Sequence, residues 1–293
     1  MSRLIRALAV ALTAAVLAAP QASADPVLTP GARLWVNPDS TTVEAARHLQ
    51  GADRANALEL AAVASANWLT TGTPAEVRKD AFTATWRANR HGEVPVLAAY
   101  NIPGRDCSQY SAGGASNTRE YKAWIAGLTE GINVGRAAVI LEPDGIALAP
   151  SDCGGSPERQ AQRVRQMNYA VDRLQSLPRT AVYLDAGHSA WHDVGTIAAR
   201  LVANGIDESD GFFLNVSNYR TNTDLIRYGT MVSKCIAYIV ELDKPSGDCA
   251  NQYWPPADAD AWYATHVPTP VSQLTHFVID EPQRPGPLDT ARG

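Results

Sequence analysis

The sequence predicts an α/β fold built on a mainly parallel sheet, either open or closed into a barrel. Strand-like apolar runs alternate with helix-like segments along most of the chain. Three of these runs end in carboxylate residues, as expected when a site lies at the carboxyl edge of a parallel sheet. About 270 residues follow a predicted signal peptide, enough for one large domain with a substantial core. We see no internal repeat and no second domain.

The N-terminal residues 1–24 have the pattern of a secretory signal peptide. Arg3 and Arg6 precede an apolar stretch over 7–19 that is too short to span a bilayer, and Ala-Ser-Ala at 22–24 resembles a cleavage site. The mature chain is therefore expected to be secreted and to stay out of the membrane after cleavage. The formal net charge of the full sequence is −5, and it becomes more negative when the two arginines are removed with the signal peptide, which argues against a nucleic-acid partner. No protein partner is indicated.

The strand-like runs are short and apolar, and the helix-like segments between them are longer. The run over 137–141 is the clearest strand, because β-branched residues lead directly to a Glu-Pro-Asp-Gly turn. In chain order, the predicted strands are 33–36, 94–101, 137–141, 180–184, 211–216 and 275–279. The predicted helices are 56–66, 75–90, 119–130, 157–175, 194–204 and 223–240. Residues 245–273 are Pro-rich and polar, and are predicted to form an insertion with one short helix.

Trp86 and Trp124 lie in helical apolar patterns and are predicted to be core residues.

Acidic residues follow three of the predicted strands. Asp106 comes after the strand at 94–101, Asp144 after the strand at 137–141 and Asp185 after the strand at 180–184. Taken singly, each could be a helix N-cap or a turn residue. Together they are predicted to surround one cleft, and clustered carboxylates indicate acid/base chemistry.

Four cysteines in an exported chain predict two disulfides, with three alternative pairings. We favour Cys107 with Cys153, because each lies just after an acid-bearing strand end and a bridge would join those two loops. Cys235 and Cys249 would then close a short loop. A structural zinc site is the alternative, although the spacings do not resemble CxxC.

Five segments resemble the motifs of glycoside hydrolase family 6, whose members cut β-1,4-glucans such as cellulose. The segments are YNIPGRDC at 100–107, LEPD at 141–144, LDAGHSAW at 184–191, LNVSNY at 214–219 and FVID at 277–280. The resemblance covers nearly all of 33–280. It implies a distorted parallel β/α barrel, an inverting mechanism, a β-1,4-glucan or cello-oligosaccharide as substrate, and no metal or organic cofactor. A serine hydrolase is disfavoured, because no Gly-x-Ser-x-Gly elbow is present.

The resemblance implies catalytic roles for five residues. Asp144 resembles the general acid, and Asp106 the neighbouring carboxylate that keeps it protonated by like-charge repulsion and helps handle the proton of the attacking water. Tyr100 would press on the sugar ring at the cleavage point, Arg105 would hold the carboxylates in place, and Asp185 would order the polar network.

A further set of residues resembles the sugar-binding surface of the family. Trp68 and Trp191 resemble aromatic platforms on which glucose rings stack, although a tryptophan at a helix end is often a core residue. Thr70, His188 and Asn215 resemble residues that bind sugar hydroxyls. A lone histidine is more often a buried structural residue, but its place in the Asp-Ala-Gly-His motif favours binding.

The sequence departs from the family after Asp280. Family members continue with Asp-Thr-Ser-Arg-Asn-Gly and a later strand that carries Lys, Glu and Asp of the active site. On this basis, residues 25–280 are predicted to be an incomplete catalytic domain that lacks its last strands, and 281–293 an aberrant tail. With codons chosen to fit, loss of an AC dinucleotide after the codon of Asp280 converts a family-like sequence into residues 280–292 as present, so we hypothesise a frameshift. The gene sequence tests this, since its other frame must then encode the family strand.

The missing segment leaves three alternatives open: an active glucanase, an inactive glucan-binding remnant, and a product that does not fold or is not expressed. Lost strands would expose a sheet edge and apolar core, and would lower stability. The short loops after Cys107 and Cys153 favour an open cleft, without deciding between endo- and exo-action.

Overall fold

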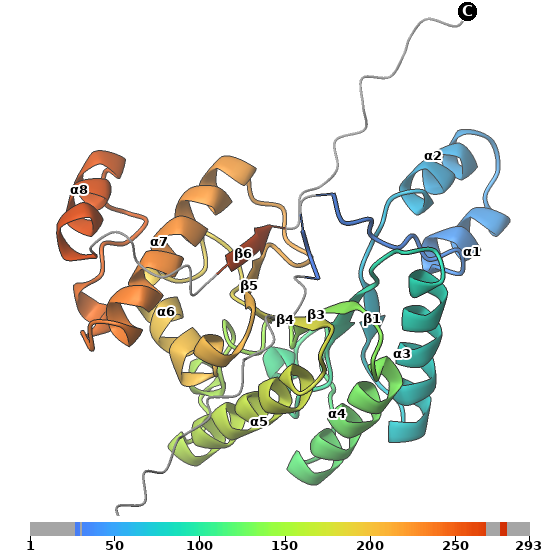
Figure 1. Ribbon diagram of the computed structural model, residues 1–293, viewed down its shortest axis with the longest axis horizontal. Helices are drawn as coiled ribbons and strands as arrows, with labels where there is room; N and C mark the ends of the chain where they lie inside the picture. Colours follow the sequence, from blue (N-terminus) through green and yellow to red (C-terminus); the bar gives the residue numbers. More distant parts are fainter. Residues whose placement is uncertain (1–26, 30, 268–275, 280–293) are drawn as a thin grey trace, which may run out of the picture.

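The computed structural model describes residues 27–29, 31–267 and 276–279 (Figure 1). The predicted signal peptide, Asp280 and the predicted tail lie outside the described residues, as do the side chains of 276–279. Among the described helices, none has a stretch that is both long and apolar enough to cross a membrane.

A six-stranded parallel sheet forms the centre of the molecule, which confirms the predicted α/β class. The strands lie in chain order, so that each pairs with the strand before it. The strands are β1 (Asn67–Leu69), β2 (Val96–Ala99), β3 (Ala137–Leu141), β4 (Thr180–Asp185), β5 (Gly211–Leu214) and β6 (His276–Ile279). Every residue of β3, β4 and β5 is buried, as expected for strands covered on both faces.

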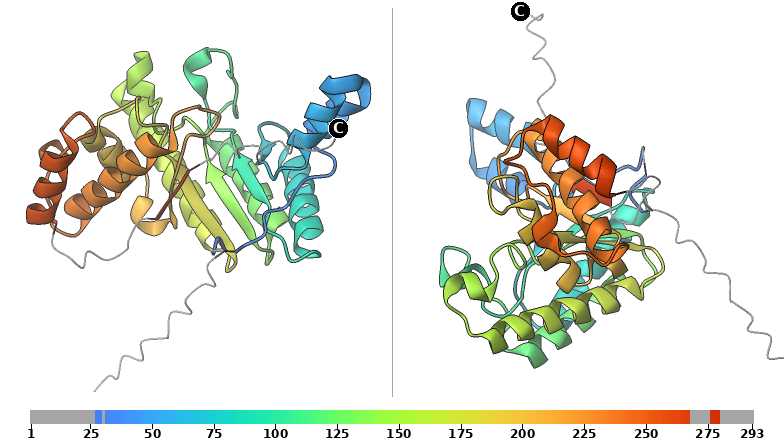
Figure 2. Two further views of the ribbon diagram at one scale, coloured as in Figure 1. Left: turned by 90° about the horizontal axis from the view of Figure 1, so that it is seen from above. Right: turned by 90° about the vertical axis from the view of Figure 1, so that its left-hand side faces the viewer.

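Helices connect successive strands and cover the sheet. The helices are α1 (Thr41–His48), α2 (Gly51–Ala61), α3 (Pro74–Asn89), α4 (Thr118–Ile132), α5 (Pro157–Gln175), α6 (Val194–Ala203), α7 (Asn222–Val240) and α8 (Pro256–His266). Figures 1 and 2 show α3, α4 and α5 side by side along one side of the sheet. The start of α3 is fixed by a capping box between Thr73 and Glu76, and α4 is capped by Asn117, whose side chain accepts from two backbone amides. These caps fix where the βα loops of the sheet end.

The first strand of the sheet differs from the sequence prediction. Residues 33–36 are not a strand, because only an isolated bridge joins Leu34 to Val94. The first strand is instead β1, a three-residue segment that follows α2 and contains Trp68. Its brevity leaves too few residues for a period-two pattern to be recognised. The other predicted strands and the short helix in the insertion are confirmed.

The two tryptophans assigned to the core differ in burial. Trp124 is 1% exposed, and its indole nitrogen donates to the carbonyl of Thr71, which confirms the prediction. Trp86 is 48% exposed, so its assignment to the core was wrong. The Arg90 guanidinium lies 4.5 Å from its ring centroid and covers the ring in place of a core.

Both predicted disulfides are present. Cys107 pairs with Cys153, and Cys235 pairs with Cys249. All four cysteines are consumed, which excludes the zinc alternative. The first bridge joins two loops that are 46 residues apart in sequence, whereas the second closes a separation of 14.

Candidate active site

The three carboxylates predicted from sequence lie at one edge of the sheet. Asp106 begins the 3-10 turn η1 (Asp106–Ser108) after β2, Asp144 lies in the turn after β3, and Asp185 ends β4. The parallel register places Leu141 beside both Ala99 and Leu184, so these three strands end at the same level. The backbone amide of Asp144 donates to Oδ2 of Asp185 at 2.7 Å. A side chain of β4 therefore fixes the turn that carries Asp144.

The turn over Glu142–Gly145 has an unusual backbone. Glu142 and Asp144 adopt positive φ values of 51° and 63°, which side chains with a Cβ disfavour. The Gly145 amide donates to the Glu142 carbonyl at 2.8 Å, and a Cβ on Gly145 would lie 2.9 Å from that same oxygen. Asp106 also has positive φ, at 53°. Strained backbone of this kind is typical of functional sites, where the surrounding structure compensates for it.

Glu142 is a buried acid for which sequence reasoning assigned no role. It is fully buried, and its Oε2 accepts from the amides of Asn101 at 2.9 Å and Ile102 at 2.8 Å. Burial raises its pKa to about 7, against the lowering effect of these hydrogen bonds and of Tyr121 and Arg163. An acid directly after five apolar strand residues was the available sequence signal. Glu142 ties the end of β2 to the end of β3.

Asp144 and Asp185 both hold protons more tightly than ordinary aspartates. Burial and then the nearby Asp106 charge raise the pKa of Asp144, while the Tyr100 hydroxyl opposes the rise. Burial and then the charge of Asp144 raise the pKa of Asp185 to about 7, although two backbone amides lower it. A half-buried carboxyl that keeps its proton beside a second carboxylate is suited to act as a general acid.

Tyr100 and Arg105 pack against each other beside these acids. Tyr100 is 5% exposed, its ring contacts Trp68 edge-on at 5.6 Å, and the Arg105 guanidinium lies 4.5 Å from its centroid. Arg105 donates to the carbonyls of Thr70 at 2.7 Å, Ser111 at 2.8 Å and Tyr100. Its hydrogen bonds within the described chain go to backbone carbonyls rather than to carboxylates, and the role expected from sequence stays a prediction. Arg105 therefore joins the loops after β1 and β2.

Two candidate sugar-binding residues have accessible rings. Trp68 is 39% exposed and lines a hollow of about 500 Å³ between β1, α3 and the start of α1. Trp191 is partly buried, 5.4 Å from the His188 ring, and Gly187 allows this packing because a Cβ there would lie 2.9 Å from the indole. These positions are compatible with stacking against sugar rings.

The polar candidates differ in accessibility. His188 is partly exposed, its Nδ1 accepts from the Ala190 amide at 3.2 Å, and burial lowers its pKa, so the neutral ring is favoured. Asn215 is fully buried, and its Oδ1 accepts from the Arg220 amide at 3.0 Å. Thr70 is partly exposed and contributes its carbonyl to Arg105. Within the described part of the chain, no group of three His, Cys, Asp or Glu residues is placed to hold a metal ion.

The comparison with known families decides the assignment. The sequence profile of glycosyl hydrolases family 6 matches residues 29–284. The chain belongs to this family. It is 34% identical to Endoglucanase 1 of Streptomyces halstedii over 267 residues, which is 87% of this chain and 82% of that protein. It is also 34% identical to Endoglucanase A of Cellulomonas fimi over 229 residues, which is 77% of this chain. The chain spans about half the length of this second relative, at 49%.

A solved structure of the family has the same fold. The endoglucanase Cel6 of Mycobacterium tuberculosis, in complex with methyl-cellobiosyl-4-deoxy-4-thio-β-D-cellobioside, superposes with a TM-score of 0.65 at 37% identity. The match covers 69% of this chain and 68% of that one. The parallel sheet described here is therefore that of the distorted β/α barrel of family 6.

Proposed function

We propose that this family 6 protein is a secreted β-1,4-glucanase that inverts the configuration of the bond it cuts, with Asp144 as its general acid. The observation that carries the proposal is the raised pKa of the half-buried Asp144, whose backbone is fixed by Asp185 and whose neighbour is Asp106. The endoglucanase names of the two curated relatives and the cello-oligosaccharide analogue in the solved structure support a β-1,4-glucan substrate. The predicted signal peptide supports secretion.

The proposed mechanism assigns one step to each carboxyl group. Asp144 donates its proton to the glycosidic oxygen as the bond to the anomeric carbon breaks. A water attacks that carbon from the opposite face of the ring, and Asp106 helps to take up the proton it loses. Asp185 acts through its hydrogen bond to the Asp144 amide and keeps the acid in place. Tyr100, packed between Trp68 and Arg105, would contact the ring at the cleavage point.

A second candidate function is glucan binding without hydrolysis. The exposed ring of Trp68 favours it, because stacking of a sugar on an indole needs no proton donor. This function corresponds to the inactive remnant considered from the sequence.

The deciding experiment measures the release of reducing sugar from a soluble β-1,4-glucan by the purified chain, with Asp144→Asn as the control. We expect release by the native protein and a loss of at least about 100-fold in the variant, because an amide cannot protonate the leaving oxygen. Calorimetric binding of cellotetraose is measured in parallel. Binding without release by a folded native chain contradicts the glucanase proposal and identifies the second function.

A further inference from the structure

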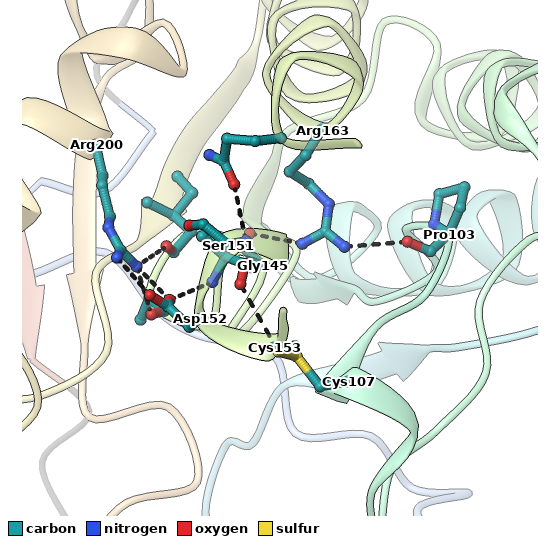
Figure 3. The surroundings of a disulfide bond; sticks show 12 residues. Pro103, Cys107, Gly145, Ser151, Asp152, Cys153, Arg163 and Arg200 are labelled. Atoms are coloured by element: carbon teal, nitrogen blue, oxygen red, sulfur yellow. Dashed lines mark hydrogen bonds and ion pairs between the residues drawn. A yellow bond between two sulfur atoms is a disulfide. The ribbon is translucent and has the colours of Figure 1, made fainter. Parts of the chain in front are cut away.

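Arg163 connects the two loops that carry Asp106 and Asp144. It lies in α5 and is 5% exposed. One terminal nitrogen donates to the Gly145 carbonyl at 2.7 Å and the other to the Pro103 carbonyl at 3.0 Å (Figure 3). Gly145 directly follows Asp144, and Pro103 precedes Asp106 by three residues. One planar group therefore reaches a fixed point in each loop, close to each carboxylate.

The helix that carries Arg163 is itself anchored. Gln162 and Gln166, on either side of Arg163, both donate to the Thr118 hydroxyl at the start of α4, at 2.6 Å and 2.9 Å. The helix begins at Pro157, and the Ser156 side chain caps it. Because α5 is held against α4, the guanidinium is presented to the loops from a rigid element, which is what accurate placement of a site requires.

The charge of Arg163 is offset in part within the same structure. Burial lowers its pKa, while the nearby Glu142 carboxylate, followed by Tyr121, opposes the change. Glu142 in turn accepts from the backbone of Asn101 and Ile102, which lead into Pro103. A buried arginine is costly unless it is paired and hydrogen-bonded, and its planar fork suits two separate carbonyls in a way that a lysine does not.

We propose that Arg163 is a positioning residue that sets the separation between the carboxyl groups of Asp106 and Asp144. The inference rests on the proposed function for its catalytic meaning, because inversion requires a defined space between the two carboxyl groups for the attacking water. The Cys107–Cys153 bridge joins the same pair of loops (Figure 3). Arg163 holds them through the carbonyls of Gly145 and Pro103, one and three residues from the respective acids.

The test compares Arg163→Met and Arg163→Lys with a matched control, Arg227→Met. Arg227 also donates through its two terminal nitrogens to two backbone carbonyls, those of Gln252 at 3.0 Å and Trp254 at 2.5 Å, but it joins α7 to the C-terminal insertion. The first measurement is the titration of the Asp144 carboxyl by carbon-13 NMR, assigned with Asp144→Asn. The other titratable groups that interact with Asp144 are Asp106, Tyr100 and Asp185, and all variants retain them.

We expect the pKa of Asp144 to fall by about one unit in Arg163→Met and by less in Arg163→Lys, because separation of the loops weakens its coupling to Asp106. The basic limb of the pH–rate profile should move down in parallel. Turnover should fall about 10- to 100-fold with KM within about threefold. Arg227→Met should lose thermal stability without any of these changes.

An unchanged Asp144 titration and pH profile in a folded Arg163 variant would overturn the proposal, even if that variant is less stable. If the methionine variant does not fold, the lysine variant decides the question by the same titration. Absence of hydrolysis by the native chain would contradict the proposed function alone, since the titration reports the carboxyl coupling without any turnover.

Discussion

The loops after β2, β3 and β4 and the C-terminal block made of α7, η4 (Ser246–Asp248) and α8 are held together in different ways. The strand-end loops are joined by buried ionisable groups, namely Glu142, Arg163 and Asp185. In the C-terminal block, the Trp262 ring stacks on His266 at 4.3 Å and meets the rings of Tyr238 at 5.2 Å and Tyr263 at 5.0 Å. The hydrogen bonds of the first region bring together the ends of successive strands, whereas two of the three ring contacts of the second lie within α8.

The difference shows that the strand-end loops give up some stability so that the carboxyl groups are placed accurately. Burying a carboxyl or a guanidinium costs free energy that only good hydrogen bonds offset, whereas burying aromatic surface is favourable without such matching. The positive φ values of Asp106, Glu142 and Asp144 add to the cost in the first region. We therefore expect changes in the loops to affect turnover and pH dependence, and changes in the C-terminal block to affect stability alone.

Among the changes that compare the two regions, Asp185→Ala has the largest expected effect. Without the carboxylate, the Asp144 amide loses its partner and the strained turn can relax away from the substrate. Turnover should fall about 100-fold while KM changes little, since a displacement near 1 Å costs that much. Steady-state kinetics on a soluble β-1,4-glucan checks this. Equal turnover in the variant and the native chain would mean that the turn does not need its contact with β4.

The second prediction concerns stability and pH through Glu142→Gln. The folded-state pKa of Glu142 is raised from 4.5 to about 7, so its contribution to stability is present below pH 4.5 and lost as the pH rises through 7. The native free energy of unfolding should therefore fall by about 2 kcal/mol or more over this interval from this group, and the variant should lack that part of the fall. Urea denaturation at several pH values measures it, and parallel curves for the two proteins would contradict it.

The third prediction compares the two disulfides. Replacing Cys107 and Cys153 by serine should lower the free energy of unfolding by about 4 kcal/mol and replacing Cys235 and Cys249 by about 3 kcal/mol, because the first bridge closes the longer loop. Turnover should fall several-fold only in the first variant, whose bridge joins the loops of Asp106 and Asp144. Equal losses of turnover in both variants would remove the distinction between the two regions.

The smallest expected effect on turnover is that of Trp262→Phe. The change removes part of the partly buried aromatic cluster and should cost about 1 kcal/mol of stability, with turnover unchanged within about twofold. Thermal unfolding and kinetics on the same preparation test both statements. A large loss of turnover would show that packing in the C-terminal block affects the geometry of the candidate active site.

Much of the fold could be predicted from sequence because the buried strands have strong signals. The run at 137–141 is apolar throughout and ends at a turn, and β4 and β5 each lie between two helices along the chain. The strand β1 could not be found this way, since three residues carry too little pattern and its pairing with Ala99 and its neighbours is a tertiary property. Trp86 shows the same limit. Helical periodicity placed it on the buried face of α3, but it does not show that the Arg90 side chain covers the Trp86 ring instead of core residues.

The candidate site could be predicted in its acids but not in the groups that hold them. Asp106, Asp144 and Asp185 each follow a recognisable strand, so a parallel sheet must bring them to one edge. Arg163 lies in the middle of a helix and reaches its two carbonyls from 18 and 60 residues away, a relation that no local pattern contains. Arg105 was recognised, but its partners are backbone oxygens, which sequence does not distinguish from carboxylates.

The order of the strands also bears on how this protein is made. Each strand pairs with the one synthesised just before it, so the sheet can grow from β1 toward β6 as the chain leaves the ribosome. We infer that Asp106, Asp144 and Asp185 meet once β4 has docked, and limited proteolysis of nascent chains stalled after β5 should find β2–β4 protected. If those strands are cut as readily as an unfolded chain, assembly waits for the later residues. If those strands are protected, the three acids come together before the C-terminal block is synthesised, and the two regions fold at different times.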